Sequence, residues 1–473
     1  MQSMTTAYQP DTIVAISTSQ GMGAIAVIRL SGDDSIAIVE KVFKKPSGES
    51  LAAQQSHSVH FGSLWQGERL LDEVVVSLFK NPKSYTGEDI IEISCHGSVF
   101  IQQEILKLLI QMGARLANPG EFTLRAFLNG KLDLSQAEAV ADVIASESQA
   151  AHDVAMQQMR GGFSTEIEDL RQQLINFTAL IELELDFSEE DVEFANRSEL
   201  EKLLETLQFK LNSLADSFAY GNVLKEGVPV AIAGKPNAGK SSLLNALFKE
   251  EKAIVSDIAG TTRDTIEDTL VIQGIKYRFI DTAGLRETSD QIESMGIERA
   301  KEKIANAKIL LYLYDRLDST PEEVIRDIKT LYHDKLIVIL VENKIDQHGG
   351  FFENEFNSQL KTELNGTYAN TLTGISCFDD ASIRSLKGML DWEVNQMKSS
   401  SEVVVANIRH YNAMIQVLAA VGSVQQGLQA GLSGDLLAVD LKEALYALSE
   451  ITGAIDVDKD ILGTIFGKFC IGK

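Results

Sequence analysis

Residues 228–241 read Val-Pro-Val-Ala-Ile-Ala-Gly-Lys-Pro-Asn-Ala-Gly-Lys-Ser, and this stretch decides the fold. It is an apolar run followed by the pattern G-x-x-x-x-G-K-[ST] at Gly234–Ser241. The backbone N–H groups of such a loop surround phosphates, and the dipole of the following helix adds to the attraction. Lys240 is expected to reach the β- and γ-phosphates, and the Ser241 hydroxyl is expected to bind Mg²⁺. The stretch therefore predicts a nucleotide-binding module built as strand, loop and helix.

The sequence around this loop predicts a doubly wound sheet. Short apolar runs alternate with helical stretches from Gly221 to about Met397. This alternation is typical of a parallel sheet with helices on both faces, as in Ras-like G domains. The predicted strands are Val228–Ala233, Lys276–Asp281, Ile309–Tyr314, Leu336–Val341 and Thr371–Ile375.

Three further motifs follow predicted strands and indicate which nucleotide binds. Asp281-Thr282-Ala283-Gly284 places a carboxylate near the metal and an N–H near the γ-phosphate. In Asn343-Lys344-Ile345-Asp346, the last carboxylate can accept hydrogen bonds from both N1–H and N2–H₂ of guanine, a donor pair that adenine lacks. Ser376-Cys377 fits the loop that backs the base, so the predicted nucleotide is GTP. The GTP contacts predicted from these motifs are Gly234, Asn237, Ala238, Gly239, Lys240, Ser241, Ser242, Asp281, Thr282, Ala283, Gly284, Asn343, Lys344, Asp346, Ser376 and Cys377.

The residue that follows Gly284 departs from the Ras pattern. It is Leu285, where Ras-like enzymes carry the Gln that orients the attacking water, and a leucine cannot do so. Another group must therefore position the water. The nearby polar residues are Arg286, Glu287, Asp290 and Glu293, and each is also readily explained as a solvated loop charge.

The composition limits the class of protein. The 473 residues include 68 acids and 43 bases, so the formal net charge is −25. This acidity argues against a protein that coats nucleic acid by charge alone, because such binding depends on Lys and Arg. The three cysteines are far apart in the sequence and support neither a zinc ribbon nor a disulfide framework. No signal-peptide pattern or membrane-length apolar stretch is found, so a cytoplasmic protein is expected.

The segments on either side of the nucleotide-binding module have different residue patterns. Residues 11–130 mix Val- and Ile-rich strands with helices, which predicts an α+β domain. Residues 131–220 carry apolar stripes at helical spacing, and the last segment repeats that pattern in too short a length for its own core. We therefore expect three domains: 1–130, a helical domain of 131–220 with 398–473, and an inserted G domain of 221–397.

Three stretches carry a family resemblance. Asp257-Ile258-Ala259-Gly260-Thr261-Thr262-Arg263-Asp264 resembles switch I of the TrmE–Era–EngA group of GTPases. The stretch from Pro119 to Glu138 (PGEFTLRAFLNGKLDLSQAE) and the terminal Phe469-Cys470-Ile471-Gly472-Lys473 narrow this. Over essentially the whole chain, the sequence resembles the MnmE (TrmE) family of tRNA-modification GTPases.

The resemblance implies both an architecture and an activity. Family members have a folate-binding, dimerising N-terminal domain, a helical domain made of two chain segments, and an inserted G domain. With a FAD-dependent partner, MnmG (GidA), they modify C5 of the wobble uridine of certain tRNAs to an aminomethyl or carboxymethylaminomethyl form. The one-carbon donor is a methylene- or formyl-tetrahydrofolate. The FAD belongs to the partner, and GTP hydrolysis is required.

The resemblance also implies how GTP is hydrolysed. The G domains dimerise transiently across the nucleotides and use K⁺ where other GTPases use an arginine finger. Thr262 corresponds to a second Mg²⁺ ligand beside Ser241, and Glu293 to the glutamate that positions water. The implied K⁺ ligands are Asn237, Ser256, Ile258 and Thr261, and Ser256, Thr261 and Thr262 join the implied GTP contacts.

Four residues correspond to folate contacts of the family: Arg29, Glu92, Lys131 and Lys473. Cations suit the glutamate tail of folate, and a carboxylate suits the amidine edge of its pterin. Without the resemblance, Arg29 and Lys131 would be read as ordinary surface charges. Cys95-His96-Gly97-Ser98 departs from the family's His-Gly-Gly, and serine is less tolerant than glycine of a positive φ.

Cys470 has more than one interpretation. One is a thiol in a buried or terminal segment. The other, which the resemblance suggests, is a functional thiol that attacks uridine C6 as a thiolate. Prenylation is rejected, because Cys-Ile-Gly-Lys has Gly and Lys in the last two positions and no polybasic stretch precedes it.

Two alternative functions can be stated. One is an Era-like ribosome-assembly GTPase without modification chemistry; its usual basic RNA-binding domain is not matched by residues 401–473, which are net −3. The other is a purely regulatory dimerising switch. Residues 131–220 hold 6 bases and 19 acids, net −13, so we expect the isolated chain to bind tRNA weakly and MnmG to supply much of the basic surface.

Overall fold

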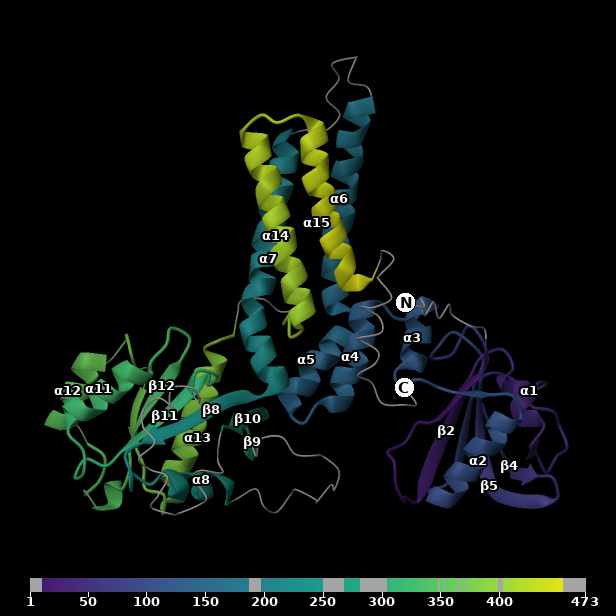
Figure 1. Ribbon diagram of the computed structural model, residues 1–473, viewed down its shortest axis with the longest axis horizontal. Coiled ribbons are helices and arrows are strands. Elements are labelled where there is room, and N and C mark those ends of the chain that lie inside the picture. The colour runs from purple at the N-terminus through teal and green to yellow at the C-terminus, as the bar shows by residue number, and fades with distance from the viewer. Residues whose placement is uncertain are drawn as a thin grey trace, which may run out of the picture. The chain divides into compact units, whose positions relative to one another are not determined.

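The computed structural model describes residues 11–186, 197–249, 268–280, 304–347, 349–352, 354–364, 366–369, 371–398 and 403–453. The chain divides into two compact units (Figure 1). The first contains residues 1–144, 156–204 and 419–473, and the second contains residues 145–155 and 205–418. Each unit is described by itself.

The first unit begins with a seven-stranded sheet of order β3-β4-β5-β6-β2-β1-β7. Its neighbours pair antiparallel, except that β1 and β7 are parallel. The strands are β1 (Ile13–Ile16), β2 (Ile25–Ser31), β3 (Phe43–Lys44), β4 (Ser58–Gln66), β5 (Arg69–Phe79), β6 (Ile90–His96) and β7 (Arg115–Leu116). The helices that accompany them are α1 (Ser35–Glu40), α2 (Val99–Gln111) and α3 (Glu121–Leu128).

This sheet confirms the predicted mixture of strands and helices. Its core forms on one face, where Ile28, Val76 and Ile93 are buried with Ile105 and Leu109 of α2. The sequence did not predict β4, which reads Ser-Val-His-Phe-Gly-Ser-Leu-Trp-Gln. Val59 and Phe61 of that strand are exposed, so its apolar residues do not gather on the core face. A simple apolar alternation is therefore missing, and that alternation is what marks a half-buried strand in a sequence.

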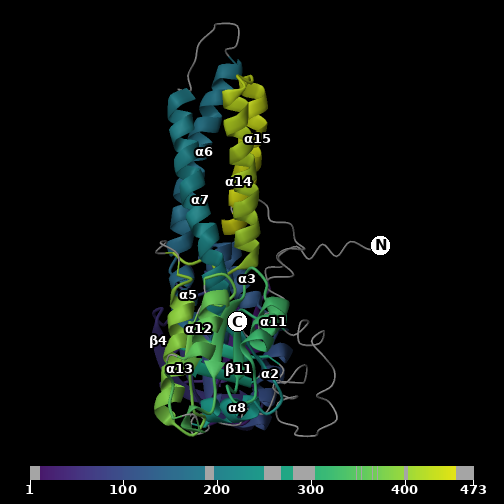
Figure 2. The same ribbon diagram turned by 90° about the vertical axis from the view of Figure 1, so that its left-hand side faces the viewer.

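Helices make up the rest of the first unit. Nearly all of α4 (Leu134–Ala145) and the last residues of α5 (Gln149–Met159) belong to it, and Gln158 Nε2 of α5 donates to the Ser135 carbonyl of α4 at 2.9 Å. The long helices α6 (Gly162–Asp186) and α15 (Gly434–Thr452) lie side by side in Figures 1 and 2. Arg171 Nε of α6 donates to Ser449 Oγ of α15 at 2.9 Å. Two segments far apart in the sequence therefore form one helical layer.

The second unit holds a six-stranded sheet of order β13-β12-β11-β8-β10-β9. The strands are β8 (Val228–Gly234), β9 (Asp268–Ile272), β10 (Ile275–Phe279), β11 (Ile309–Tyr314), β12 (Ile337–Glu342) and β13 (Thr371–Gly374). The helices are α8 (Lys240–Phe248), α11 (Pro321–Leu331), α12 (Glu355–Leu364) and α13 (Asp380–Asn395), with a short 3₁₀ helix, η2, at Ile345–Gln347.

Helices cover both faces of this sheet, as predicted. All six residues of β11 are buried, and they alternate between two cores. Leu311 and Leu313 belong to the core that includes α8 and α13, whereas Leu310 and Tyr312 belong to the core that includes α11 and α12. A strand buried on both sides needs apolar residues throughout, which explains the uninterrupted run in the sequence.

One strand departs from the predicted parallel arrangement. β9 pairs antiparallel with β10 at the edge of the sheet. The two strands are joined by Gln273 and Gly274, which both have positive φ (50° and 83°). Two such residues allow the tight hairpin turn whose twist matches an antiparallel pair.

The second unit also contains residues 205–226 of α7 (Arg197–Glu226) and residues 408–418 of α14 (Ile408–Gln429). Phe218 of α7 stacks on Tyr411 of α14 with centroids 4.5 Å apart. The backbone N–H of Val405 donates to Ser217 Oγ at 3.0 Å. The segment that follows α13 therefore returns to α7. No helix in the described part of the chain is both long and apolar enough to cross a membrane.

Candidate functional site

The phosphate loop has the backbone that its glycines predict. Gly234, at the end of β8, has φ 145°, and a Cβ there would overlap the carbonyl oxygen of Leu313 on β11. Gly239 has φ 99° and is the residue before α8, and Asn237 also has a positive φ of 60°. Glycine adopts such conformations without steric cost, so the loop can turn tightly and present its N–H groups. This geometry fits a phosphate-binding cradle.

Lys240, Ser241 and Ser242 form the first turn of α8. The N–H groups of a first helical turn have no partner within the helix and therefore favour an anion. The Lys240 ammonium folds back over the loop and donates to the carbonyls of Gly234 (2.9 Å) and Lys235 (2.8 Å). Lys235 itself points elsewhere, because it pairs with Glu323 of α11. Of the two lysines, Lys240 is thus the one placed over the cradle.

Asn343 connects this loop to the predicted base-binding motif. Its side chain is buried, and Nδ2 donates to the Ala238 carbonyl of the phosphate loop at 2.8 Å. Its Oδ1 accepts from the Cys377 thiol at 3.4 Å. One amide therefore ties together three loops that are about 35 to 140 residues apart in sequence. All three loops leave the carboxyl ends of parallel strands, which is where open α/β sheets bind ligands.

The remaining residues of the base motif are also held in place. Lys344 has a left-handed φ of 62°, and its ammonium pairs with Asp315 at 2.8 Å. Asp346 lies in η2, which begins where the Ile345 N–H donates to the Ile375 carbonyl at 3.3 Å. Burial, and then the Asp346 charge, raise the pKa of Cys377 despite its bond to Asn343. This thiol is therefore protonated and unreactive at neutral pH, and it serves the site by packing.

Ser376 is fixed by the start of α13. Its carbonyl accepts from Ser382 Oγ at 2.9 Å, and its Oγ accepts from the Phe378 N–H at 3.3 Å. Asp379 caps that helix by accepting from the N–H groups of Ala381 and Ser382. The loop predicted to back the base is thus anchored by a well-capped helix.

Several predicted residues lie outside the described part of the chain. They include the switch and metal positions, the folate lysine at the end of the chain and the terminal cysteine. These residues are Ser256, Ile258, Thr261, Thr262, Asp281, Thr282, Ala283, Gly284, Leu285, Arg286, Glu287, Asp290, Glu293, Cys470 and Lys473.

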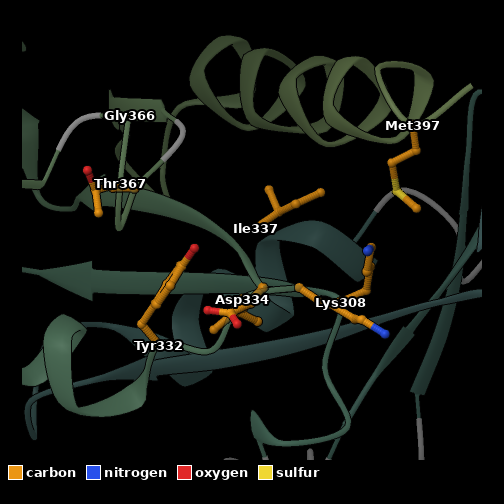
Figure 3. A pocket seen from close by; sticks show the side chains of 10 residues that line it. Lys308, Tyr332, Asp334, Ile337, Gly366, Thr367 and Met397 are labelled. Atoms are coloured by element: carbon orange, nitrogen blue, oxygen red, sulfur yellow. The ribbon is translucent and has the colours of Figure 1, made fainter.

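A cavity of about 530 Å³ lies at the amino-terminal ends of the strands of the same sheet (Figure 3). Its lining includes Lys308 before β11, Ile337 at the start of β12, and Met397 beyond α13. Lys308 and Ile337 mark the amino ends of β11 and β12, whereas the phosphate and base loops follow the carboxyl ends of the strands. The cavity is therefore separate from the predicted nucleotide site.

Two of the predicted folate residues meet in the N-terminal sheet. Arg29 of β2 is directly opposite Glu92 of β6, and its guanidinium pairs with that carboxylate at 2.7 Å. The guanidinium also lies 5.6 Å from the ring centres of both Tyr85 and Phe122. Both members of the pair keep about a quarter of their side-chain surface exposed. A cation and a carboxylate are thus accessible beside the partly exposed ring of Tyr85, whereas Phe122 is fully buried behind them, and this set suits a flat heteroaromatic ligand.

Lys131 contacts the loop that carries Tyr85. Its ammonium donates to the Pro82 carbonyl at 3.0 Å, and its stem is 3.4 Å from where a Cβ on Gly87 would be. The loop from Pro82 to Gly87 therefore bridges Lys131 to the Arg29–Glu92 pair.

Ser98 takes its place without strain. It has φ −69° and an extended conformation just before α2. The glycine that the backbone requires in this motif is Gly97, because a Cβ there would overlap the Gly23 carbonyl. The departure from the family's glycine thus falls where any residue fits.

The sequence motif around Pro119–Glu138 contains a structural ion cluster that sequence reasoning missed. Arg125 is only 3% exposed and pairs with Asp11 (2.7 Å), Glu88 (3.1 Å) and Glu121 (3.2 Å). Buried charges need such partners, because an unpaired ion in the interior is costly. Part of this distinctive motif therefore serves the fold. The spacing of Glu121 and Arg125, one helical turn apart, was the available signal.

Comparison with known proteins identifies the relatives of the chain. A family model described as the MnmE helical domain matches residues 134–470, and one described as the N-terminus of the GTP-binding protein TrmE matches residues 12–131. A relative from Flavobacterium johnsoniae, named tRNA modification GTPase MnmE, is 52% identical over 98% of this chain and 99% of its own length. A relative of the same name from Cytophaga hutchinsonii is 51% identical over the full length of both chains.

Proposed function

The chain belongs to the MnmE family of tRNA modification GTPases, and from that premise we propose how its residues divide the work. As a member, it is a GTP hydrolase that acts in tRNA modification. The observation that carries the assignment of residues is the Asn343 side chain, which joins the phosphate loop to the base motif.

In this proposal, the phosphates lie against the loop Gly234–Ser241 and the first turn of α8. Lys240 exchanges its two carbonyl partners for phosphate oxygens, since both lie within the cradle. Asp346 accepts from N1–H and N2–H₂ of guanine, while Ser376 and Cys377 back the base. Ser241 and Thr262 hold Mg²⁺, which offsets charge on the β- and γ-oxygens. The further GTP contacts are those predicted from the sequence.

Hydrolysis needs a substitute for the glutamine and the arginine of other GTPases. We assign the positioning of water to Glu293, because Leu285 has no polar group. Asn237, with Ser256, Ile258 and Thr261, holds K⁺, which supplies the positive charge that an arginine finger supplies elsewhere. Asn237 lies within the phosphate loop and has a left-handed backbone (φ 60°), which bends the chain at this position.

The modification step is proposed for the N-terminal domain. Glu92 recognises the amidine edge of a reduced folate pterin, Arg29 holds that carboxylate in position, and Lys131 with Lys473 attracts the folate tail. A formyl- or methylene-tetrahydrofolate held by these residues would supply the carbon for C5 of the wobble uridine. MnmG, with its FAD, is the proposed partner. Cys470 is the candidate nucleophile for uridine C6, and the protein works in the cytoplasm as a homodimer formed by its N-terminal domain.

Two measurements test this function. Nucleosides from the tRNA of cells that lack the chain are analysed by mass spectrometry, with the intact gene restored as the control. We expect loss of the C5-modified wobble uridine and its return on restoration; an unchanged nucleoside profile contradicts the proposal. For hydrolysis, we expect faster GTP turnover in K⁺ than in Na⁺ at equal ionic strength, and equal rates would rule out the assigned cation.

A further inference from the structure

A buried carboxylate lies directly before the base motif. Glu342 is the last residue of β12 and is 0% exposed, and Asn343 follows it. A carboxylate in such a position is retained only if it is paired and hydrogen-bonded, because removing it from water is costly. The partners of the Glu342 carboxylate therefore identify which elements it connects.

Both oxygens of Glu342 have partners from other elements. Oε1 lies 3.3 Å from Nε of Arg316, just beyond β11, and Oε2 accepts from Nδ2 of Asn357 on α12 at 2.8 Å. The Asn357 Oδ1 in turn accepts from the hydroxyl of Tyr314 at 2.8 Å. Burial, and then the Glu342 charge, raise the pKa of Tyr314, so this hydroxyl remains a donor. The carboxylate thus joins the end of β11 to α12.

Two ion pairs cross between the ends of β11 and β12. Asp315 pairs with Lys344 at 2.8 Å, and the next residue, Arg316, pairs with Glu342. The two pairs lie on either side of Asn343, so the residues flanking it are each fixed to the neighbouring strand. The backbone carbonyl of Glu342 also accepts from the Ile375 N–H, just after β13, at 2.7 Å, so this residue is connected to the strand on the other side of β12 as well.

The arginine extends the connection to the segment after Asp346. The Arg316 guanidinium lies 4.9 Å from the ring centre of Phe352. The neighbouring Phe351 packs against Gly374 at the end of β13, where a Cβ would overlap its ring. The Gly350 N–H then donates to the Ile345 carbonyl at 2.9 Å. The chain is therefore held on both sides of Asp346.

We propose that Glu342 is a positioning residue for guanine recognition: through Arg316 and Phe352 it sets where the Asp346 carboxylate lies. This inference rests on the proposed reading of guanine by Asp346. Glu342 does not touch the nucleotide. It acts through the backbone that carries Asp346, so its loss should weaken the choice of base and leave the phosphate chemistry intact.

The test compares the affinity of the full-length protein for GDP and for IDP, which lacks the 2-amino group of guanine. In Glu342→Gln, the negative charge that pairs with Arg316 is lost while the size of the side chain is kept. We expect the GDP dissociation constant to rise about tenfold, the size of one charge-assisted hydrogen bond, and the IDP constant to rise by less. The preference for GDP should therefore fall, while kcat at saturating GTP stays within about twofold.

Two further variants separate positioning from stability. Glu393→Gln is the matched control, since Glu393 is 4% exposed in the same unit and accepts from Thr371 Oγ1 at 2.7 Å. It should lower the melting temperature and keep the GDP preference. Phe352→Leu removes the ring over Arg316 from a half-exposed side chain, so it should fold even if Glu342→Gln does not, and it should lower the preference.

The outcomes distinguish this inference from the function on which it rests. Asp346→Asn should abolish the preference for GDP, because the amide cannot accept from both guanine donors. If it does so while Glu342→Gln and Phe352→Leu keep the wild-type preference, the positioning role is overturned. If Asp346→Asn itself keeps the preference, the proposed reading of guanine is wrong instead.

Discussion

Gly239→Ala is a sharp test of the nucleotide site. Gly239 has φ 99°, and a Cβ on it would lie less than 3.0 Å from Nδ2 of Asn343, a separation that real Cβ atoms do not show. Asn343 must then move and lose its 2.8 Å hydrogen bond to the Ala238 carbonyl. The substitution therefore acts on the link between the phosphate and base loops.

The expected loss of unfolding free energy is the sum of three contributions. An alanine in the left-handed region costs about 1–2 kcal/mol, and the lost hydrogen bond about 1 kcal/mol. The smaller entropy of the unfolded chain returns about 0.5 kcal/mol. A net loss of about 2 kcal/mol should lower the melting temperature by roughly 4–8 °C. Only the lost hydrogen bond, about 1 kcal/mol, concerns the link between the two loops, so GDP binding should weaken about fivefold.

Two glycines in the same unit provide controls for thermal melts and fluorescent-nucleotide titrations. Gly274 also has a positive φ, 83°, but its nearest neighbour is Gln149, so Gly274→Ala should lower stability and keep GDP affinity. Gly388 lies within α13 with nothing near its absent Cβ, so Gly388→Ala should stabilise by up to about 1 kcal/mol. If Gly239→Ala binds GDP within threefold of the wild type, the link through Asn343 does not matter for binding.

Three further predictions concern the rest of the chain. Arg125→Met should cost about 3–5 kcal/mol of unfolding free energy at pH 7, because it removes the cation paired with the buried Glu88 and one of the two arginines that pair with Asp11 and Glu121. Burial alone would raise the pKa of Asp11 and Glu121, but hydrogen bonds from Arg115, together with the Arg125 charge, outweigh it and lower both. The two ionised carboxylates therefore stabilise the fold above their ordinary pKa values, and this stabilisation is lost as the pH falls through the lowered pKa values. The difference in unfolding free energy between the wild type and Arg125→Met, measured by urea titration, should therefore narrow below about pH 4.5. A difference that stays constant down to pH 3 would contradict this. Glu92→Gln should weaken binding of a reduced folate at least tenfold in calorimetry while GDP affinity stays unchanged, and equal folate affinity would refute the pterin contact. The logarithm of tRNA affinity should fall less steeply with the logarithm of salt concentration for the isolated chain than for its complex with the flavoprotein, whereas equal slopes would show that the acidity of residues 131–220 has no bearing on tRNA binding.

The nucleotide loop could be predicted from the sequence because its chemistry is local. Phosphates are bound by the backbone of consecutive residues, so Gly234–Ser241 contains both the turn and the groups that bind. The buried strands were equally readable, because β11 is apolar throughout its length. The family resemblance rested on continuous stretches of the same kind. The three-domain division drawn from residue patterns, and the switch, metal and terminal residues, stay predictions.

Tertiary structure decided the contacts between distant residues. The bond between Asn343 and Ala238 spans 105 residues, and the pair of Arg29 with Glu92 spans 63. The Arg316–Glu342 pair and the pairs of Arg125 with Asp11 and Glu88 likewise depend on which strands and helices become neighbours. Sequence spacing carries no information on such pairings, because they are set by sheet order and register. Residues 228–241 by themselves therefore predicted a phosphate-binding loop, whereas the packing of β8, β11 and β12 decided how the loops predicted to select the base are held.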